Sequence, residues 1–153
     1  MLQRIQTLYL LLALLANSLL FSFPLVMLLN SQQVYTMGIT GVFANGETVS
    51  ATSDFLPLTM LVAAISSVIL AAIFFFNNRP AQIRLGVFGL LLSLGCIGLM
   101  YFYSIKFTAL LAAQDKVYKL GFVLPAIVAI LLFLAIKAIR KDEMLIRSID
   151  RIR

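Results

Sequence analysis

Polar side chains inside long apolar runs are the first place to look for chemistry in this chain of 153 residues. Asn17 is the most polar of them, and Ser18 and Ser22 lie beside it. Transport, pumping and catalysis within a membrane need ionisable groups at depth, whereas the deep groups here are an amide and hydroxyls. An asparagine in lipid can hydrogen-bond to a neighbouring helix, which stabilises the contact by about 0.6 to 2 kcal/mol. We therefore expect Asn17 to hold helices together, with a substrate contact as the alternative.

The chain has one cysteine, Cys96, and no histidine. Disulfide exchange needs a second thiol, and a reactive thiolate needs a base or a cation beside it. Histidine is the commonest metal ligand and the commonest general base. The sequence therefore predicts no catalytic residue, no cofactor and no metal site, and a protein that is not an enzyme. An enzyme would need a polar cluster at the outer surface, for which the candidates are Glu47, Asp54, Tyr101 and Lys119.

Small residues recur at helical spacing in two of the apolar runs. In one they step by three and four positions, at Gly86, Gly89, Ser93 and Cys96. In the other they repeat every four positions, at Ala63, Ser67 and Ala71. Small-residue faces let the backbones of lipid-embedded helices approach closely. We expect these faces to pack within the molecule, with docking of another membrane protein or of a second copy as the alternative.

Four apolar runs must position these residues, and they cover 7–29, 55–76, 85–105 and 120–136. The chain is 62% hydrophobic and 12% charged, whereas a soluble domain carries about 25% charged residues. A helix needs about 20 apolar residues to cross a bilayer, with about 17 as the lower end. The sequence predicts an all-α membrane protein, a four-transmembrane-helix bundle that forms a single domain over 1–153. Pro24 and Pro125 lie inside the first and fourth runs and predict kinks there.

Two polar segments flank these spans. In the external loop 30–54, Asn45-Gly46 lies between β-forming residues and predicts a small β-hairpin within 34–52, over the outer end of the bundle. An irregular cap is the alternative. In the tail 137–153, Leu145, Ile149 and Ile152 form one helical stripe. This stripe predicts a cytoplasmic amphipathic helix that lies on the inner leaflet or docks a partner.

The basic residues predict the orientation of the chain. Nine of the 12 Lys and Arg residues lie on the side of the termini and of the 77–84 loop, and three lie on the opposite side. Positive charge collects on the cytoplasmic side of membrane proteins, so we expect both termini in the cytoplasm. The partners expected for this charge are anionic lipid head groups, and nothing beyond charge supports nucleic acid. The candidate docking residues are Arg4, Arg140, Arg147 and Arg151.

Both ends of the chain carry distinctive motifs, MLQRIQTLYL at 1–10 and KDEMLIRSIDRIR at 141–153. In these motifs and in its length and span layout, the chain resembles a family of small four-span inner-membrane proteins from Bacteroidota, a domain-of-unknown-function family. The resemblance implies a multi-pass protein of the bacterial inner membrane. It brings no activity, ligand or catalytic residue with it.

Our functional hypothesis from the sequence is a non-enzymatic accessory or scaffold subunit of an inner-membrane complex, bound to a membrane protein or to a second copy. The alternative is a small-molecule or lipid carrier that opens a cavity between helices kinked at Pro24 and Pro125. That cavity would be lined partly by Asn17, Ser18 and Ser22.

Overall fold

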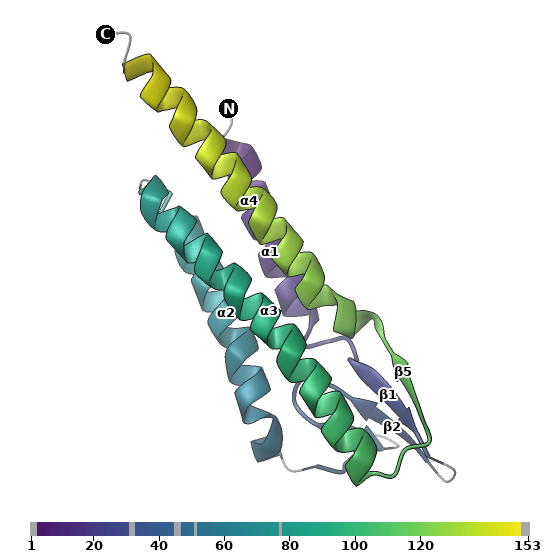
Figure 1. Ribbon diagram of the computed structural model, residues 1–153. Helices are drawn as coiled ribbons and strands as arrows, with labels where there is room; N and C mark the ends of the chain where they lie inside the picture. The colour runs from purple at the N-terminus through teal and green to yellow at the C-terminus, as the bar shows by residue number, and fades with distance from the viewer. Residues whose placement is uncertain (1–2, 31–32, 45–46, 51, 77, 151–153) are drawn as a thin grey trace.

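The computed structural model of the chain describes residues 3–30, 33–44, 47–50, 52–76 and 78–150. Four helices and a small antiparallel sheet form this described part (Figure 1). The helices are α1 (Gln3–Leu19), α2 (Leu56–Phe74), α3 (Arg79–Leu110) and α4 (Leu120–Asp150), and the 3₁₀ turn η1 (Thr52–Phe55) precedes α2. The strands are β1 (Val26–Leu29), β2 (Val34–Met37), β3 (Val42–Ala44), β4 (Glu47–Thr48) and β5 (Asp115–Tyr118).

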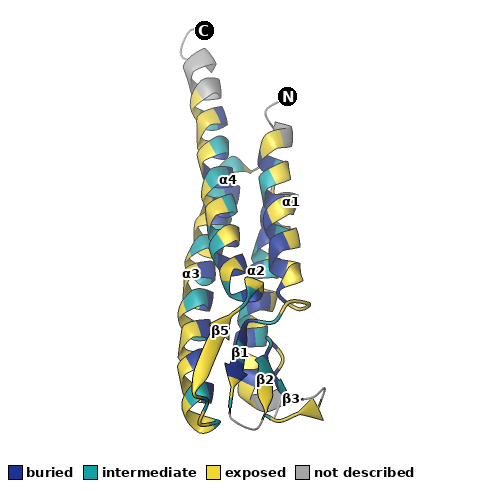
Figure 2. Cartoon of the chain, turned by 90° about the vertical axis from the view of Figure 1, so that its right-hand side faces the viewer, coloured by how far each residue is buried: buried dark blue, intermediate teal, exposed yellow. Residues whose placement is uncertain are grey.

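The helices run side by side, and the molecule has two different ends. Both termini and the turn between α2 and α3 lie at one end, called the terminal end here (Figure 1). The sheet lies at the other end, called the sheet end, beside the last turns of α3 and the first turns of α2. Figure 2 shows that each helix buries one side and exposes the other.

The buried side of each helix is a stripe of residues spaced alternately by three and four positions. The stripes are Gln6, Leu10, Ala13 and Asn17 in α1, Leu58, Val62, Ile65, Ile69 and Ala72 in α2, and Gln82, Gly86, Gly89, Ser93, Cys96, Met100, Tyr103 and Phe107 in α3. This alternation keeps one narrow seam of a helix against its neighbours, which is the spacing of left-handed helix packing. The opposite faces carry exposed large apolar side chains.

Three of the described helices are long and apolar enough to cross a membrane, namely α2, α3 and residues Leu120–Met144 of α4. The apolar part of α1, Ile5–Leu19, is shorter. Where the sequence predicts four spans, the described residues therefore form three long apolar helices and one shorter one. The exposed apolar faces and the three long helices fit a membrane-associated protein.

The predicted helix over 7–29 is wrong beyond Leu19. The chain turns there, with the Phe23 N–H donating to the Leu19 carbonyl oxygen at 3.0 Å, and Val26–Leu29 forms strand β1. Pro24 explains the change because it has no N–H group and disfavours helical geometry at the residue before it. The kink predicted at Pro24 is therefore also wrong, because this residue lies outside the helix.

Pro24 marks the place where α4 begins. Its carbonyl oxygen accepts a hydrogen bond from the Gly121 N–H at 3.2 Å. A Cβ atom at position 121 would lie 2.5 Å from that oxygen, so the close approach requires glycine.

The fourth predicted span and the tail form one helix. Pro125 lies inside α4, which continues from Leu120 to Asp150. The backbone of the tail is thus helical as far as Asp150. The stripe of Leu145, Ile149 and Ile152 lies outside the described side chains, so its amphipathic role stays a prediction.

The sheet is larger than the predicted hairpin. Strands β3 and β4 pair antiparallel, with Phe43 opposite Thr48, so the hairpin predicted around Asn45-Gly46 is present, although those two turn residues lie outside the described ones. The full strand order is β4-β3-β2-β1-β5, and every pair is antiparallel. Strand β5 comes from the connection between α3 and α4, and all four of its residues are exposed (Figure 2).

Candidate functional site

Three polar side chains from three different helices are buried at the terminal end: Gln6, Gln82 and Asp142, which are 4–7% exposed. The Gln6 amide nitrogen Nε2 donates to Oδ2 of Asp142 and, at 3.3 Å, to the Ala138 carbonyl oxygen. The Gln82 Nε2 donates to the Ala72 carbonyl oxygen at 3.0 Å. That carbonyl is one of the last four of α2, which have no partner inside their own helix. The two amides therefore fasten α1 to α4 and α3 to α2.

Three pockets lie at the terminal end, and the two amides line the first of them. The first, of about 360 Å³, has Gln6 on one side and Arg79 and Gln82 on the other, between α1 and the α2–α3 turn. The second, of about 250 Å³, lies between α1 and α4. The third, of about 470 Å³, is lined by α4 alone. Gln6 lines the first two pockets, and Lys137 and Lys141 line the last two. The terminal end is therefore hollowed on several sides.

The pockets differ in their charge. The second contains Lys137 and Lys141 but also the carboxylate of Asp142. The third, called the α4 pocket here, contains three cations and no carboxylate among its described lining. Its residues are Phe133, Ile136, Lys137, Arg140, Lys141 and Met144. The α4 pocket can therefore hold an anion beside an apolar surface. The second pocket is less suitable for an anion because it contains the Asp142 carboxylate.

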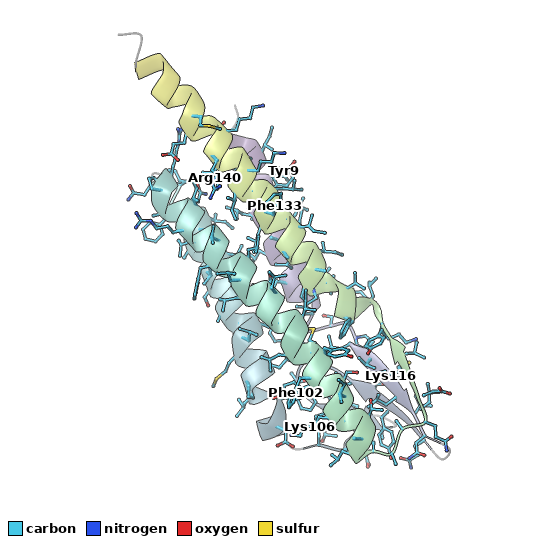
Figure 3. The ribbon with its side chains drawn as sticks, viewed as in Figure 1. Tyr9, Phe102, Lys106, Lys116, Phe133 and Arg140 are labelled. Atoms are coloured by element: carbon cyan, nitrogen blue, oxygen red, sulfur yellow. The ribbon has the colours of Figure 1, made fainter. Side chains whose placement is uncertain are left out.

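The predicted docking residues are only partly described. Arg140 is exposed and lines the α4 pocket, on the same helix as Phe133 and closer to the terminal end (Figure 3). The side chains of Arg4 and Arg147, and the whole of Arg151, lie outside the described part of the chain. Their docking role stays a prediction.

Asn17 lies in the contact between α1 and α2 and is 1% exposed. Its Nδ2 donates to the Val62 carbonyl oxygen at 3.0 Å and to Ser66 Oγ at 2.8 Å, while its Oδ1 has no partner among the described residues. The hydroxyl of Ser18 donates within α1, to the Leu15 carbonyl oxygen. The linings of the three pockets at the terminal end include neither Asn17 nor Ser18, and the carrier hypothesis stays a prediction.

The two small-residue faces point in different directions. On α3, a Cβ at Gly86 would lie 2.9 Å from Ile136 Cγ1 of α4. One at Gly89 would lie 3.3 Å from a Leu132 methyl group of α4 and 3.4 Å from Val68 Cγ1 of α2, so this face packs inside the bundle, mainly against α4. Ser93 and Cys96 continue the same buried face.

On α2, Ala63 and Ser67 are exposed instead, and Ala71 is half-buried. One helix therefore uses its small residues inside the bundle, and the other presents them to the surroundings.

The polar residues at the sheet end are separate from one another. Asp54 accepts a hydrogen bond through its backbone carbonyl from the Tyr103 hydroxyl at 2.8 Å, whereas Tyr101 is exposed. Among the described residues, no hydrogen bond or ion pair joins the side chains of Glu47, Asp54, Tyr101 and Lys119. No group of three His, Cys, Asp or Glu residues in the described part could hold a metal ion.

Sequence reasoning missed the buried polar residues of the terminal end, although a signal for them exists. Gln82 lies four positions before Gly86 and extends the same stripe. Gln6 extends the stripe of Asn17 in the same way, and Asp142 lies three positions after the buried Ile139. Following each stripe beyond its apolar part would have indicated that these polar side chains face the neighbouring helices.

Comparison with models of protein families gives a match over nearly the whole chain. A family model described as domain of unknown function (DUF4293) matches residues 2–152. The resemblance to a domain-of-unknown-function family, inferred from the two end motifs, is confirmed at that level. No curated protein matches the chain.

Proposed function

This chain belongs to the DUF4293 family of unknown function, and we propose that it is a four-span membrane protein that serves as a non-enzymatic accessory subunit of a membrane assembly. The three long apolar helices support the membrane location. The remaining points are the fourth span, the orientation and the role as a subunit, and each rests on its own observation.

The shorter helix α1 supplies the fourth span in this proposal. Its 17 residues extend over about 25 Å, because an α-helix rises about 1.5 Å per residue, and this length is near the lower limit for a span. It lies alongside α4 (Figures 1 and 2). Its outward face exposes Leu8, Leu11, Leu12, Leu15 and Leu19. Because α1 lies alongside α4, a bilayer that surrounds α4 would also surround α1. The exposed leucines of α1 would then contact lipid and not water.

The charge at the two ends supports an orientation with both termini in the cytoplasm. The inner membrane of a bacterial cell, as the proposed location, rests on the family resemblance. Arg79, Arg84, Lys137, Arg140 and Lys141 belong to the terminal end. The sheet end carries three lysines, and aromatic rings lie beside two of them: Lys106 lies 5.8 Å from the ring centroid of Phe107, and Lys116 lies 5.6 Å from that of Tyr118. Phe102 is exposed about one turn before Lys106 (Figure 3). Concentration of positive charge at one end is typical of the cytoplasmic side, and aromatic side chains at the other end are typical of a membrane–water interface on either side.

The observation that carries the accessory role is the outward face of α2. The bundle packs the small residues of α3 against α4, but it leaves Ala63 and Ser67 exposed. A lipid-facing surface of small residues allows a further helix to approach closely. The buried polar side chains Gln6, Asn17 and Gln82 meanwhile bond to neighbouring helices, so they serve the fold.

Site-specific photo-crosslinking in native membranes tests this role. A photoreactive phenylalanine analogue is placed at Ser67 and, as the matched control, at Ile130, which is exposed on α4. We expect a discrete protein adduct from position 67 and only lipid adducts from position 130, with the partner identified by mass spectrometry. A protein that is monomeric in mild detergent and gives no adduct at position 67 would overturn the accessory role.

A further inference from the structure

The α4 pocket combines three cations with apolar side chains, and the proposed accessory role does not involve these residues. We propose that it binds one anionic phospholipid of the leaflet at the terminal end, with the phosphate on its cations and an acyl chain on its apolar part. This inference rests on the proposed membrane crossing but not on the proposed partner.

The spacing of the cations places them on one face of α4. Arg140 and Lys141 follow Lys137 by three and four positions, and side chains at these separations are neighbours on a helix. They extend over about 6 Å of helix length, at about 1.5 Å per residue. None of the three forms an ion pair with a carboxylate among the described side chains. The three cations are therefore exposed together within about one helical turn. A phosphate group bound there would neutralise their charge.

Phe133 and Ile136, two of the three apolar residues that line the pocket, lie on the side of the bilayer centre, and Met144 lies beyond the cations. Phe133 is 56% exposed and precedes Lys137 by about one helical turn, and Ile136 is buried beside it. In the proposed orientation, the order along the helix is an apolar surface followed by cations toward the cytoplasm. A phospholipid has the same order, with acyl chains below an anionic head group, and basic pockets on the cytoplasmic side of membrane helices bind such head groups. A free phosphate ion would make no use of Phe133.

The difference in charge favours phosphate binding in the α4 pocket over the pocket between α1 and α4. Lys137 and Lys141 also line the pocket between α1 and α4, but the Asp142 carboxylate there would repel a phosphate group. The α4 pocket, of about 470 Å³, adds Arg140 and has no carboxylate among its described lining. Arginine also binds phosphate with two parallel hydrogen bonds, which lysine does not.

Native mass spectrometry of the full chain in mild detergent, titrated with dioleoyl phosphatidylglycerol, tests the site. The test variant is K137Q/R140Q/K141Q, and the matched control K106Q/K116Q/K119Q removes three charges at the sheet end. A cation near an anionic lipid contributes about 1 kcal/mol, so we expect the apparent affinity to fall about fivefold per charge and on the order of 100-fold in the test variant. The control variant should retain the affinity of the unchanged protein. Circular dichroism of both variants verifies that the helices remain folded.

Two results would overturn the proposal. Equal losses in the two triple variants would mean that net charge alone attracts the lipid. Displacement of the lipid by inorganic phosphate at equal concentration would mean a site for soluble anions. The apolar contact is tested by Phe133→Ala, which we expect to weaken the binding of dioleoyl phosphatidylglycerol, and unchanged binding would overturn that part. Because these measurements use the purified chain, their failure is distinct from failure to find a crosslinked partner.

Discussion

The two ends of the bundle are held together by different interactions. At the sheet end, the buried ring of Phe55 stacks on Tyr103 and Phe107, with ring centroids 5.2 and 4.9 Å apart. At the terminal end, Gln6 and Gln82 form hydrogen bonds beside open pockets. Aromatic packing fills one end, whereas amide hydrogen bonds hold a hollow structure at the other.

This difference separates a rigid part from a part that can accept a ligand. A close-packed aromatic cluster tolerates little change of volume, so it fixes the start of α2 relative to the last turns of α3. Hydrogen bonds between helices keep the helices in place without filling the space around them. The lipid proposed for the α4 pocket can therefore occupy the terminal end without repacking the core. Three sets of variants test the difference between the two ends.

The largest effect is expected at the aromatic cluster. Phe55→Ala should lower the free energy of unfolding by about 3–5 kcal/mol, because it leaves a cavity between two rings. The matched variant Tyr103→Phe keeps the ring and loses only the hydrogen bond to Asp54, with an expected loss of about 1 kcal/mol. Both are measured by unfolding in mixed SDS micelles, monitored by circular dichroism. A loss of less than 1 kcal/mol for Phe55→Ala would mean that the cluster does not determine the stability of the sheet end.

The next effect concerns the glycines of the helix contacts. Gly121→Ala should lower the free energy of unfolding by about 3 kcal/mol, because the new methyl group meets the Pro24 backbone, which cannot rotate away. Gly86→Ala meets the Ile136 side chain, which can adjust, so we expect a loss of about 1 kcal/mol.

Gly95→Ala is the control for both, since nothing lies within 4 Å of a Cβ atom there. Thermal unfolding in detergent gives the ranking. If Gly86→Ala were the more damaging of the two, the junction of α4 with Pro24 would not be the tighter contact.

After Phe55→Ala and Gly121→Ala, the third and smallest of the principal effects is expected at the amide of the terminal end. Gln6→Leu removes the donor to the buried Asp142 carboxylate, and an unpaired buried acceptor costs about 2 kcal/mol. The double variant Q6L/D142L should recover most of this loss, because apolar side chains can replace a buried polar pair at little cost. A double-mutant cycle from chemical unfolding measures the coupling. Additive losses in the two single variants would show that the two side chains do not act as a pair.

Much of the helical part of the fold could be predicted because its signals are local. The long uncharged runs predicted α2 and α3, and the Asn45-Gly46 pair predicted the β3–β4 hairpin. Residues 20–29 could not be predicted in this way, because a short apolar run suits a buried strand as well as a helix. Strand β1 could be identified only from its pairing with neighbouring strands. One of these neighbours, β5, is formed by residues 115–118, far along the chain.

The candidate site shows the same limit. Arg140 was predicted from its charge, and the structure places it in the α4 pocket. Its association with Phe133 was not predictable, because exposure of Phe133 depends on which face of α4 the other helices cover. Gln6 and Asp142 are separated by 136 positions, so no local pattern could pair them.

The sequence by itself determined the apolar helices, the uneven distribution of basic residues and the family, because composition, spacing and end motifs are properties of the chain alone. Only the tertiary structure decided which small-residue face is buried. Gly86 and Gly89 pack against α4, whereas Ala63 and Ser67, at a similar helical spacing, are exposed. Small residues permit close approach but do not select a neighbour. The arrangement of the four helices around each face makes that selection.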